Sequence, residues 1–293
     1  MVALRDKRVC IVGLGLMGGS FGMALRRARA VGEVIGVVRR PEAVQEAIDL
    51  GAVDRATMDA ARAVAEADIV ILCTPVRTII RQMEELGPHL RPGTVLTDMG
   101  STKTAICRAM AALPDGVQPV GSHPMCGKEQ AGIRAADPDL YQGKTWVISP
   151  LPRSSEDAVR AVEALAEAVG ARVIHLEPAR HDRLVAAISH VPYLLACSLV
   201  AATDEVGRQD AAVWDVAASG FRDTSRLASS DVRMLMDILM TNRSAVLEMM
   251  DRVSAAFHHL RELVASGDEA ALEAELRQIR QVREDHVVSP GRS

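Results

Sequence analysis

A histidine and a serine follow two strand-like segments of this chain, where their side chains could work on one ligand. His123 comes after the apolar segment 118–121, and Ser101 comes after the segment 94–98. In an open parallel sheet, ligands bind outside the carboxyl ends of the strands. A neutral imidazole can accept a proton at physiological pH, so His123 is a candidate general base. A purely structural, hydrogen-bonded role is the alternative for a single histidine.

A glycine-rich turn near the start of the chain could hold the phosphates of a dinucleotide. The glycines follow the β-branched run 9–12 in the spacing G-x-G-x-x-G and precede a segment of helical spacing. Strand, glycine turn and helix are the context that this motif requires, because the helix N-terminus offers N–H groups to a pyrophosphate. The residues predicted to form this turn are Gly13, Leu14, Gly15, Leu16, Met17 and Gly18.

The end of the second strand-like segment, 33–38, indicates which dinucleotide binds. An NAD site usually has an acidic residue here to accept from the ribose 2′-hydroxyl. This chain has Val38, followed by Arg39 and Arg40. Two guanidinium groups and no carboxylate favour a 2′-phosphate, so we expect NADP, with NAD possible. The alternative is that the arginine pair is only a solvated loop.

Two further strand ends are expected to line the same cofactor site. One is the end of the segment 67–73, with Cys73 followed by Thr74, Pro75 and Val76, and the other carries Gly100 with Ser101.

The second half of the chain contributes one more histidine and two arginines. Pro192 would kink a helix and could direct His190 into a cleft. Arg222 and Arg226 lie in the turn-rich segment 220–227, which we expect to interrupt the helices. An arginine in a cleft can bind a carboxylate through two hydrogen bonds, although a surface position is the simpler interpretation of each.

The order of the elements predicts an α/β fold followed by an all-helical part. Strand-like and helix-like segments alternate from 8 to 177, as in a Rossmann-type doubly wound parallel sheet. Beyond 178 only helical patterns follow, at 179–203, 211–218, 232–266 and 268–285. We therefore expect a dinucleotide-binding domain at 1–177 and a helical substrate and dimerisation domain at 178–293.

Composition narrows the class of protein. The net charge is −4, whereas a nucleic-acid-binding protein usually has a basic face. The most apolar stretch, 191–202, is shorter than the ~18 residues of a membrane span. Because a strand-like segment follows almost at once, we expect no signal peptide. The five cysteines are scattered and never spaced C-x-x-C, as expected of reduced thiols in a cytoplasm.

Five motifs together resemble the prephenate/arogenate dehydrogenases. They lie in the same order as in that family and are found at 13–20, 98–103, 121–129, 189–192 and 220–226. The resemblance implies a dinucleotide-binding domain followed by a helical domain through which two subunits form a homodimer. It also implies an enzyme of tyrosine biosynthesis that catalyses oxidative decarboxylation with hydride transfer to NAD(P)+.

The resemblance also implies roles for individual residues. His123 would accept a hydrogen bond from the ring hydroxyl of the substrate, with Ser101 orienting that contact. His190 and Arg226 would bind the substrate, Arg226 through a carboxylate, and Glu129 would belong to the network at the pocket entrance. Cys126 and Lys128 depart from the usual alanine and small hydroxyl residue, which would alter the pocket rim.

Other functions fit the sequence less well. The β-hydroxyacid dehydrogenases resemble the first domain, but they use a lysine in the helical domain, and this chain has none beyond Pro178. A non-catalytic NADP-sensing protein would not need Ser101, His123 and His190 around one cleft. The pairs His123 with Cys126 and His258 with His259 do not complete a metal ligand set, so no metal is expected.

Some questions stay open at this point. No motif distinguishes prephenate from arogenate as the substrate. We expect no separate regulatory module for tyrosine after the last helix, so that any feedback would act at the active site.

Overall fold

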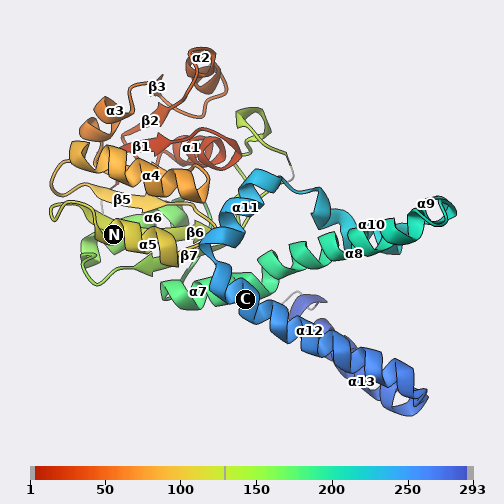
Figure 1. Ribbon diagram of the computed structural model, residues 1–293. Coiled ribbons are helices and arrows are strands. Elements are labelled where there is room, and N and C mark those ends of the chain that lie inside the picture. Colours follow the sequence, from red (N-terminus) through yellow and green to blue (C-terminus); the bar gives the residue numbers. More distant parts are fainter. Residues whose placement is uncertain (1–3, 129, 289–293) are drawn as a thin grey trace. The chain divides into compact units, whose positions relative to one another are not determined.

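The computed structural model describes residues 4–128 and 130–288 (Figure 1). Its centre is an eight-stranded sheet with the strand order β3-β2-β1-β4-β5-β6-β7-β8. The order reverses between β1 and β4, as in dinucleotide-binding folds, so a ligand is expected outside the carboxyl ends of these two strands. The strands are β1 (Arg8–Val12), β2 (Glu33–Val37), β3 (Arg55–Thr57), β4 (Ile69–Leu72), β5 (Val95–Asp98), β6 (Gln118–Pro124), β7 (Thr145–Pro150) and β8 (Arg172–His175).

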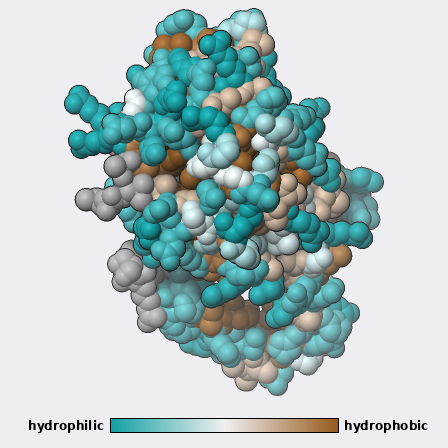
Figure 2. All heavy atoms as spheres, turned by 90° about the vertical axis from the view of Figure 1, so that its left-hand side faces the viewer, coloured by the Kyte–Doolittle hydropathy of each residue, from teal (hydrophilic) through white to brown (hydrophobic). Residues whose placement is uncertain are grey.

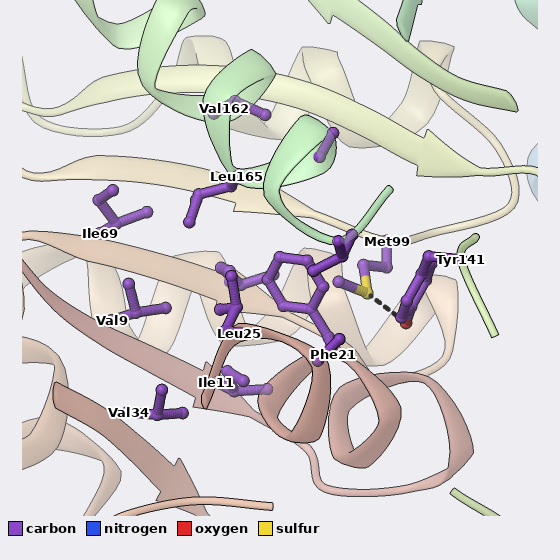
Figure 3. Packing of buried hydrophobic residues seen from close by; sticks show 14 of the residues in the cluster. Val9, Ile11, Phe21, Leu25, Val34, Ile69, Met99, Tyr141, Val162 and Leu165 are labelled. Atoms are coloured by element: carbon purple, nitrogen blue, oxygen red, sulfur yellow. Dashed lines mark hydrogen bonds between the residues drawn. The ribbon is translucent and has the colours of Figure 1, made fainter. Parts of the chain in front are cut away.

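Alternating side chains of the central strands supply two apolar cores, one on each face of the sheet. In β1, Val9 and Ile11 belong to one buried cluster, and Cys10 and Val12 belong to the other. This alternation explains why the strands are continuous apolar runs, since both faces are covered. Figure 3 shows the first core, where Phe21 lies among aliphatic side chains of β1 and α6.

Helices cover both faces. One core includes residues of α1 (Leu16–Ala28), α2 (Glu42–Asp49) and α6 (Glu156–Ala168); the other includes residues of α3 (Ala60–Glu66), α4 (Val76–Leu86) and α5 (Thr104–Ala111). Two short 3-10 turns, η1 (Gly87–His89) and η2 (Ile133–Ala135), join these elements. The expected α/β class with a Rossmann-type first half is confirmed.

The sheet is not parallel throughout. β6 pairs antiparallel with β7, and β7 pairs parallel with β8, so the last two strands run against the other six. Neither apolar segment reveals its direction, because direction depends on the connection and not on the strand itself. The sequence patterns also missed β3, whose three half-buried residues contain an arginine and no apolar run.

The helical part begins with one long, continuous helical segment. α7 (Pro178–Val185) passes into α8 (Val191–Gly207) through a single π-helical stretch, η3 (Ala186–His190). Pro192 lies in the first turn of α8, where its missing N–H disturbs the regular hydrogen-bond ladder and favours the wider π turn. The expected irregularity at Pro192 is thus a π-helical stretch.

Two expectations for the later helices were wrong. The segment 220–227, expected to be an interruption, forms α10 (Ser219–Ser225) and the 3-10 turn η4 (Arg226–Ser229) after the short α9 (Ala212–Asp215). The hydroxyls of Thr224 and Ser225 donate to the backbone oxygens of Gly220 and Phe221, one turn earlier, so these side chains bond within the helix and do not form a turn. The expected helix 232–266 is divided at Asn242 into α11 (Val232–Thr241) and α12 (Arg243–Ser266).

The helical segment Pro178–Gly207 corrects the expectation that no stretch is long enough for a membrane span. It is 30 residues long and, by length and composition alone, apolar enough to cross a membrane. The reason is that α7, η3 and α8 are continuous, so the apolar run 191–202 is extended on both sides. Core helices of soluble proteins can be equally long and apolar. This segment also carries the buried polar residues His181, Asp182 and His190.

The chain divides into two compact units, residues 1–243 and 244–293. Hydrophilic side chains predominate on the face of the molecule in Figure 2. The second unit contains α12 from Ser244 onward, then α13 (Glu269–Arg283) and the π-helical η5 (Glu284–Val288). Gly267, at a φ of +68°, ends α12, and the Asp268 side chain caps α13 by accepting from the N–H of Ala271.

Candidate active site

The glycine turn lies at the carboxyl end of β1 and leads directly into α1. Gly13 has a φ of +101°, a conformation that strongly favours glycine. A Cβ on Gly18 would lie 2.1 Å from the carbonyl oxygen of Gly13, so the helix can approach the turn only without a side chain there. Gly13 also packs closely against the loop that follows β4, since a Cβ on it would lie 2.7 Å from Cγ2 of Thr74.

The start of α1 fits the phosphates of a dinucleotide. Gly15 is the N-cap, with no side-chain hydrogen bond to the first turn, and the first turn has no acidic residue. A Cβ on Gly15 would have no protein atom within 4 Å, so the backbone there is open to a ligand. Helix N–H groups without partners and a partial positive charge attract a pyrophosphate at such a position.

The turn's neighbours occupy the positions expected of a cofactor site. Leu14, Leu16 and Met17 are half-buried beside the glycines. Cys73 and Thr74 follow β4, Pro75 is the N-cap of α4 and Val76 is its first residue. At the end of β2, Val38 is buried while Arg39 and Arg40 are exposed, and neither guanidinium group pairs with a carboxylate among the described residues.

His123 lies near the carboxyl end of β6 and is joined to a histidine of α7. Its Nδ1 is 2.9 Å from Nε2 of His181, and the two rings meet edge to face at 5.1 Å and 71°. The other nitrogen of His181, Nδ1, lies 2.8 Å from a carboxylate oxygen of Asp182. His181 and Asp182 are buried, so water does not compete for these contacts.

The Asp182 carboxylate is held at the start of α5. One of its oxygens accepts from the backbone N–H of Lys103 at 2.7 Å, and the other accepts from that of Thr104 at 2.8 Å. Burial raises the pKa of Asp182, but the hydrogen bonds from His181 and from these amides outweigh it and hold the pKa below its usual value. Asp182 is therefore a charged acceptor that fixes α7 against the N-terminus of α5.

Both candidate site histidines are neutral at physiological pH. Burial, followed by the charges of His181, Lys103 and His190, holds the pKa of His123 well below 6.5. Burial also lowers the pKa of His190 to about 4, although Asp182 partly opposes this shift. A neutral imidazole can accept a proton from a substrate, as a general base must.

Asn242, at the break between α11 and α12, joins His190 to the same network. Its amide nitrogen lies 2.7 Å from the backbone oxygen of Asp182 and 3.1 Å from Nδ1 of His190. α11 is held near the sheet by the hydroxyl pair Thr102 and Thr241, 2.9 Å apart. The break at Asn242 thus has a structural reason, because the residue turns inward to pair two buried polar groups.

A buried ion pair supports the strand ends below the histidines. Lys103 Nζ pairs with the Asp98 carboxylate and donates to the backbone oxygen of Ser122 at 2.5 Å, with both charged side chains fully buried. Asp98 also accepts from the N–H of Gly100 at 2.7 Å and of Ser122 at 3.0 Å. These contacts tie β5, which is followed by Ser101, to β6, which carries His123.

Comparison with known proteins connects this arrangement to one family along nearly the whole chain. Residues 21–175 match the family described as prephenate dehydrogenase, nucleotide-binding domain, and residues 177–278 match prephenate dehydrogenase, dimerization domain. The chain belongs to the prephenate dehydrogenase family. The resemblance expected from the motifs is confirmed, and the chain is a dehydrogenase with a nucleotide-binding domain.

Individual members of the prephenate dehydrogenase family agree over most of their length. The prephenate dehydrogenase of Bacillus subtilis is 32% identical over an alignment that covers 89% of this chain and 71% of the B. subtilis protein. The crystal structure of prephenate dehydrogenase from A. aeolicus, in complex with hydroxyphenyl propionate and NAD+, superposes with a TM-score of 0.89 at 30% identity, covering 95% of this chain and 98% of that one. Synechocystis arogenate dehydrogenase superposes with a TM-score of 0.84 at 30% identity, covering 96% and 100%.

The structure of this prephenate dehydrogenase family member brings some of the predicted site residues together and leaves others apart. His123 and His190 are linked through His181, Asp182 and Asn242. Ser101 is half-buried just beyond β5. Arg226 is an exposed residue of η4, which packs against α8. Glu129 lies outside the described residues.

Sequence reasoning assigned no role to several residues of this network, namely Asp98, Lys103, His181, Asp182 and Asn242. The dipeptide His181-Asp182 was visible as a signal, since a buried imidazole needs a partner for each nitrogen. Lys103 gave no signal in the sequence, because lysine is usually exposed and is buried only when paired with an opposite charge. Its partner Asp98 is recognised only in the folded structure. Asn242 lay inside an uninterrupted helical pattern and gave no signal.

Two other features lie away from these residues. A cavity of about 320 Å³ opens at the amino ends of the strands, lined among others by Lys7, Asp68, Arg91 and Gln118. Ligands of such sheets bind at the opposite edge, so this cavity does not belong to the candidate active site. Within the described residues, no group of three or more His, Cys, Asp or Glu side chains could hold a metal ion.

Proposed function

We propose that this protein is a prephenate/arogenate dehydrogenase, which oxidises and decarboxylates a cyclohexadienol acid in tyrosine biosynthesis. The observation that carries the proposal is a neutral His123 at the carboxyl edge of the sheet, on a strand separated only by β4 and β5 from the strand whose glycine turn fits a dinucleotide. The family supports the same reaction, since relatives at about 30% identity are a prephenate dehydrogenase and an arogenate dehydrogenase.

In the proposed mechanism, His123 accepts the proton of the ring hydroxyl through Nε2. A nicotinamide held at the glycine turn would accept the hydride that leaves the carbinol carbon. As the hydroxyl proton passes to His123 and that hydride departs, the ring carboxylate is lost as carbon dioxide, and the electron pair of the broken C–C bond makes the ring aromatic, which provides most of the driving force. The protein's task is therefore to position the ring acid and to remove one proton.

The other site residues are proposed to position the substrate. Ser101, on the loop after β5, would orient the contact between the hydroxyl and His123. His190 would donate a hydrogen bond to the substrate, and Arg226 would bind one of its carboxylates with a planar guanidinium fork. Glu129 would act at the pocket entrance. Cys126 and Lys128 would give that rim a composition different from the family pattern.

We propose NADP as the preferred cofactor, with NAD possible. Support comes from the end of β2, where an acidic residue would repel a 2′-phosphate and where this chain has Val38 with two exposed arginines. The phosphates would lie on Gly13, Gly15 and Gly18 with the α1 N-terminus. The bound complex of the A. aeolicus relative contains NAD+, so the 2′-phosphate contact is the feature to be tested.

The proposed organisation is a cytoplasmic homodimer with a dinucleotide-binding domain at 1–177 and a helical domain at 178–293. The helical domain carries exposed apolar side chains, and matches a family domain described by dimerization. Those exposed at 45% or more include Ile188, Leu195, Val206, Phe257 and Ile279. The five cysteines are all free thiols, as a reducing compartment requires.

One experiment tests the proposed function. Purified protein is assayed with prephenate and with arogenate, each with NAD and with NADP, and the reduced nicotinamide is followed by absorbance. We expect turnover of at least one ring acid, faster with NADP. Absence of turnover in all four combinations would refute the proposal. Sedimentation of the same sample tests the dimer, and a monomer at assay concentration would refute that part alone.

A further inference from the structure

The contacts of Asp182 determine where the proton of His181 lies. The ionised carboxylate can only accept, and it already accepts from the backbone N–H groups of Lys103 and Thr104. The nitrogen of His181 that faces it at 2.8 Å, Nδ1, must therefore carry a proton. A neutral His181 then has its lone pair on Nε2.

That lone pair in turn determines the tautomer of His123. Nε2 of His181 lies 2.9 Å from Nδ1 of His123, and one of the two must donate. Since Nε2 of a neutral His181 accepts, Nδ1 of His123 carries the proton. The other ring nitrogen of His123, Nε2, is then unprotonated, and it has no hydrogen-bond partner among the described residues.

We propose that His181 and Asp182 are positioning residues that hold His123 in the tautomer with a bare Nε2. The inference that this nitrogen serves as the base rests on the proposed function, whereas the tautomer itself does not. When His123 takes up a proton at Nε2, its Nδ1–H still points at His181, and the Asp182 carboxylate lies behind that ring. The arrangement fixes the orientation of the His123 ring both before and after it takes up the proton.

With Asp182 ionised, the opposite order of protons would require a second proton on His181. Among the described residues, the charged and titratable groups that act on His123 are Lys103 before α5, His181 on α7 and His190 on η3. Lys103 is matched by Asp98 on β5. A doubly protonated His181 would instead donate to His123 and leave its Nε2 protonated, a state that cannot accept the hydroxyl proton.

The tautomer can be observed directly by NMR of the whole enzyme. Protein labelled with nitrogen-15 in its eight histidines is recorded at neutral pH in a long-range proton–nitrogen experiment. The signals of His123 are identified by their loss in the variant His123→Asn. We expect a protonated Nδ1 and an unprotonated Nε2. A protonated Nε2 on His123 would overturn the proposal, whether or not the protein turns over either ring acid.

Two variants of His181 test the consequence for catalysis. His181→Leu removes the acceptor, and we expect kcat to fall about 10–100-fold with KM changed by less than about threefold. His181→Gln places an amide oxygen near the former Nε2, and we expect it to restore kcat to within about fivefold of the wild type. His89→Gln, on an exposed histidine, is the matched control and should leave kcat unchanged.

The outcomes separate a positioning role from a merely structural one. If His181 had only a structural role, both His181→Leu and His181→Gln would lower the melting temperature, and neither would change the tautomer of His123. An unchanged kcat in folded His181→Leu would contradict the proposal, as would a Gln variant no better than Leu. Wild-type protein inert toward both ring acids would refute the proposed function, while the NMR result would still decide the tautomer.

Discussion

The side-chain nitrogen of Asn242 contacts two acceptors at once, the backbone oxygen of Asp182 at 2.7 Å and Nδ1 of His190 at 3.1 Å. A backbone carbonyl can only accept, so the group that faces it must be the NH2 end of the amide. The same NH2 group faces His190, whose Nδ1 must therefore accept. Neutral His190 thus has its proton on Nε2 and can serve as a hydrogen-bond donor to a substrate.

The neutral state of buried His190 predicts a pH dependence of stability. Its pKa is lowered from 6.5 to about 4 in the folded protein, so between these values the unfolded chain binds more protons. The free energy of unfolding should therefore fall as the pH drops through this window, by about 2 kcal/mol between pH 7 and pH 5 from this group. Urea unfolding at both pH values measures the effect.

A variant isolates this contribution from other titrating groups. His190→Gln removes the titration, so its loss of stability from pH 7 to pH 5 should be smaller than that of the wild type by about 2 kcal/mol. His89→Gln, whose imidazole is exposed, should behave like the wild type. Equal pH dependence in wild type and His190→Gln would contradict a lowered pKa.

Removal of the proposed general base should act on turnover. His123→Ala is expected to lower kcat by about 10²–10⁴, the usual contribution of a positioned base, while cofactor binding persists. Steady-state rates with the preferred ring acid measure kcat, and quenching of protein fluorescence by the nicotinamide measures binding. A kcat equal to that of the wild type would remove His123 from the mechanism.

The glycine turn offers a pair of substitutions with opposite effects. Gly15→Ala should leave thermal stability nearly unchanged, because its Cβ meets no protein atom within 4 Å, but it should weaken dinucleotide binding about tenfold or more. Gly18→Ala should destabilise the fold by about 1–3 kcal/mol or more, because its Cβ would lie 2.1 Å from the oxygen of Gly13. Thermal melts and cofactor titration distinguish the two. Full cofactor affinity in Gly15→Ala would exclude this turn as the phosphate site.

Local patterns predicted the first half of the fold well, because each buried strand is a short β-branched run beside a recognisable turn. The glycine turn, the ends of β4 and β5 and the position of His123 all follow from such patterns. The direction of β7 and the existence of β3 do not, since they depend on pairing with distant strands. The alternation of strands and helices gives the fold class but not every strand direction.

The site was predicted only as far as single motifs extend. His123 and His190 were identified separately, but the link between them runs through His181 and Asp182 on α7 and Asn242 at the end of α11. The amide of Asn242 ends α11 because two buried groups need a donor, a requirement that exists only after the chain has folded. Sequence motifs therefore identified the candidate catalytic residues, whereas the tautomers of His123 and His190 can be inferred only from tertiary contacts.

Cofactor preference should depend on the two arginines after β2. The double variant Arg39→Ala/Arg40→Ala should raise the KM for NADP about 10–100-fold by removing charged hydrogen bonds to a 2′-phosphate. The KM for NAD should change little, since NAD lacks that phosphate. Arg160→Ala, on the exposed surface of α6, is the control for loss of an exposed arginine far from the end of β2. An equal change for both cofactors would show that the arginines act on the net charge and not on the phosphate.

Substrate binding by Arg226 can be tested against its neighbour Arg222. Both side chains are exposed and lie four residues apart, one on η4 and one on α10. If Arg226 binds a carboxylate, Arg226→Ala should raise the KM for the ring acid about 10–100-fold with little effect on kcat, because the contact is present before and during the reaction. Arg226→Lys should recover only part of the loss, since an ammonium group lacks the planar fork. Arg222→Ala should leave KM unchanged. If the two alanine variants raise KM equally, general attraction of an anion explains the effect, and another residue must bind the carboxylate.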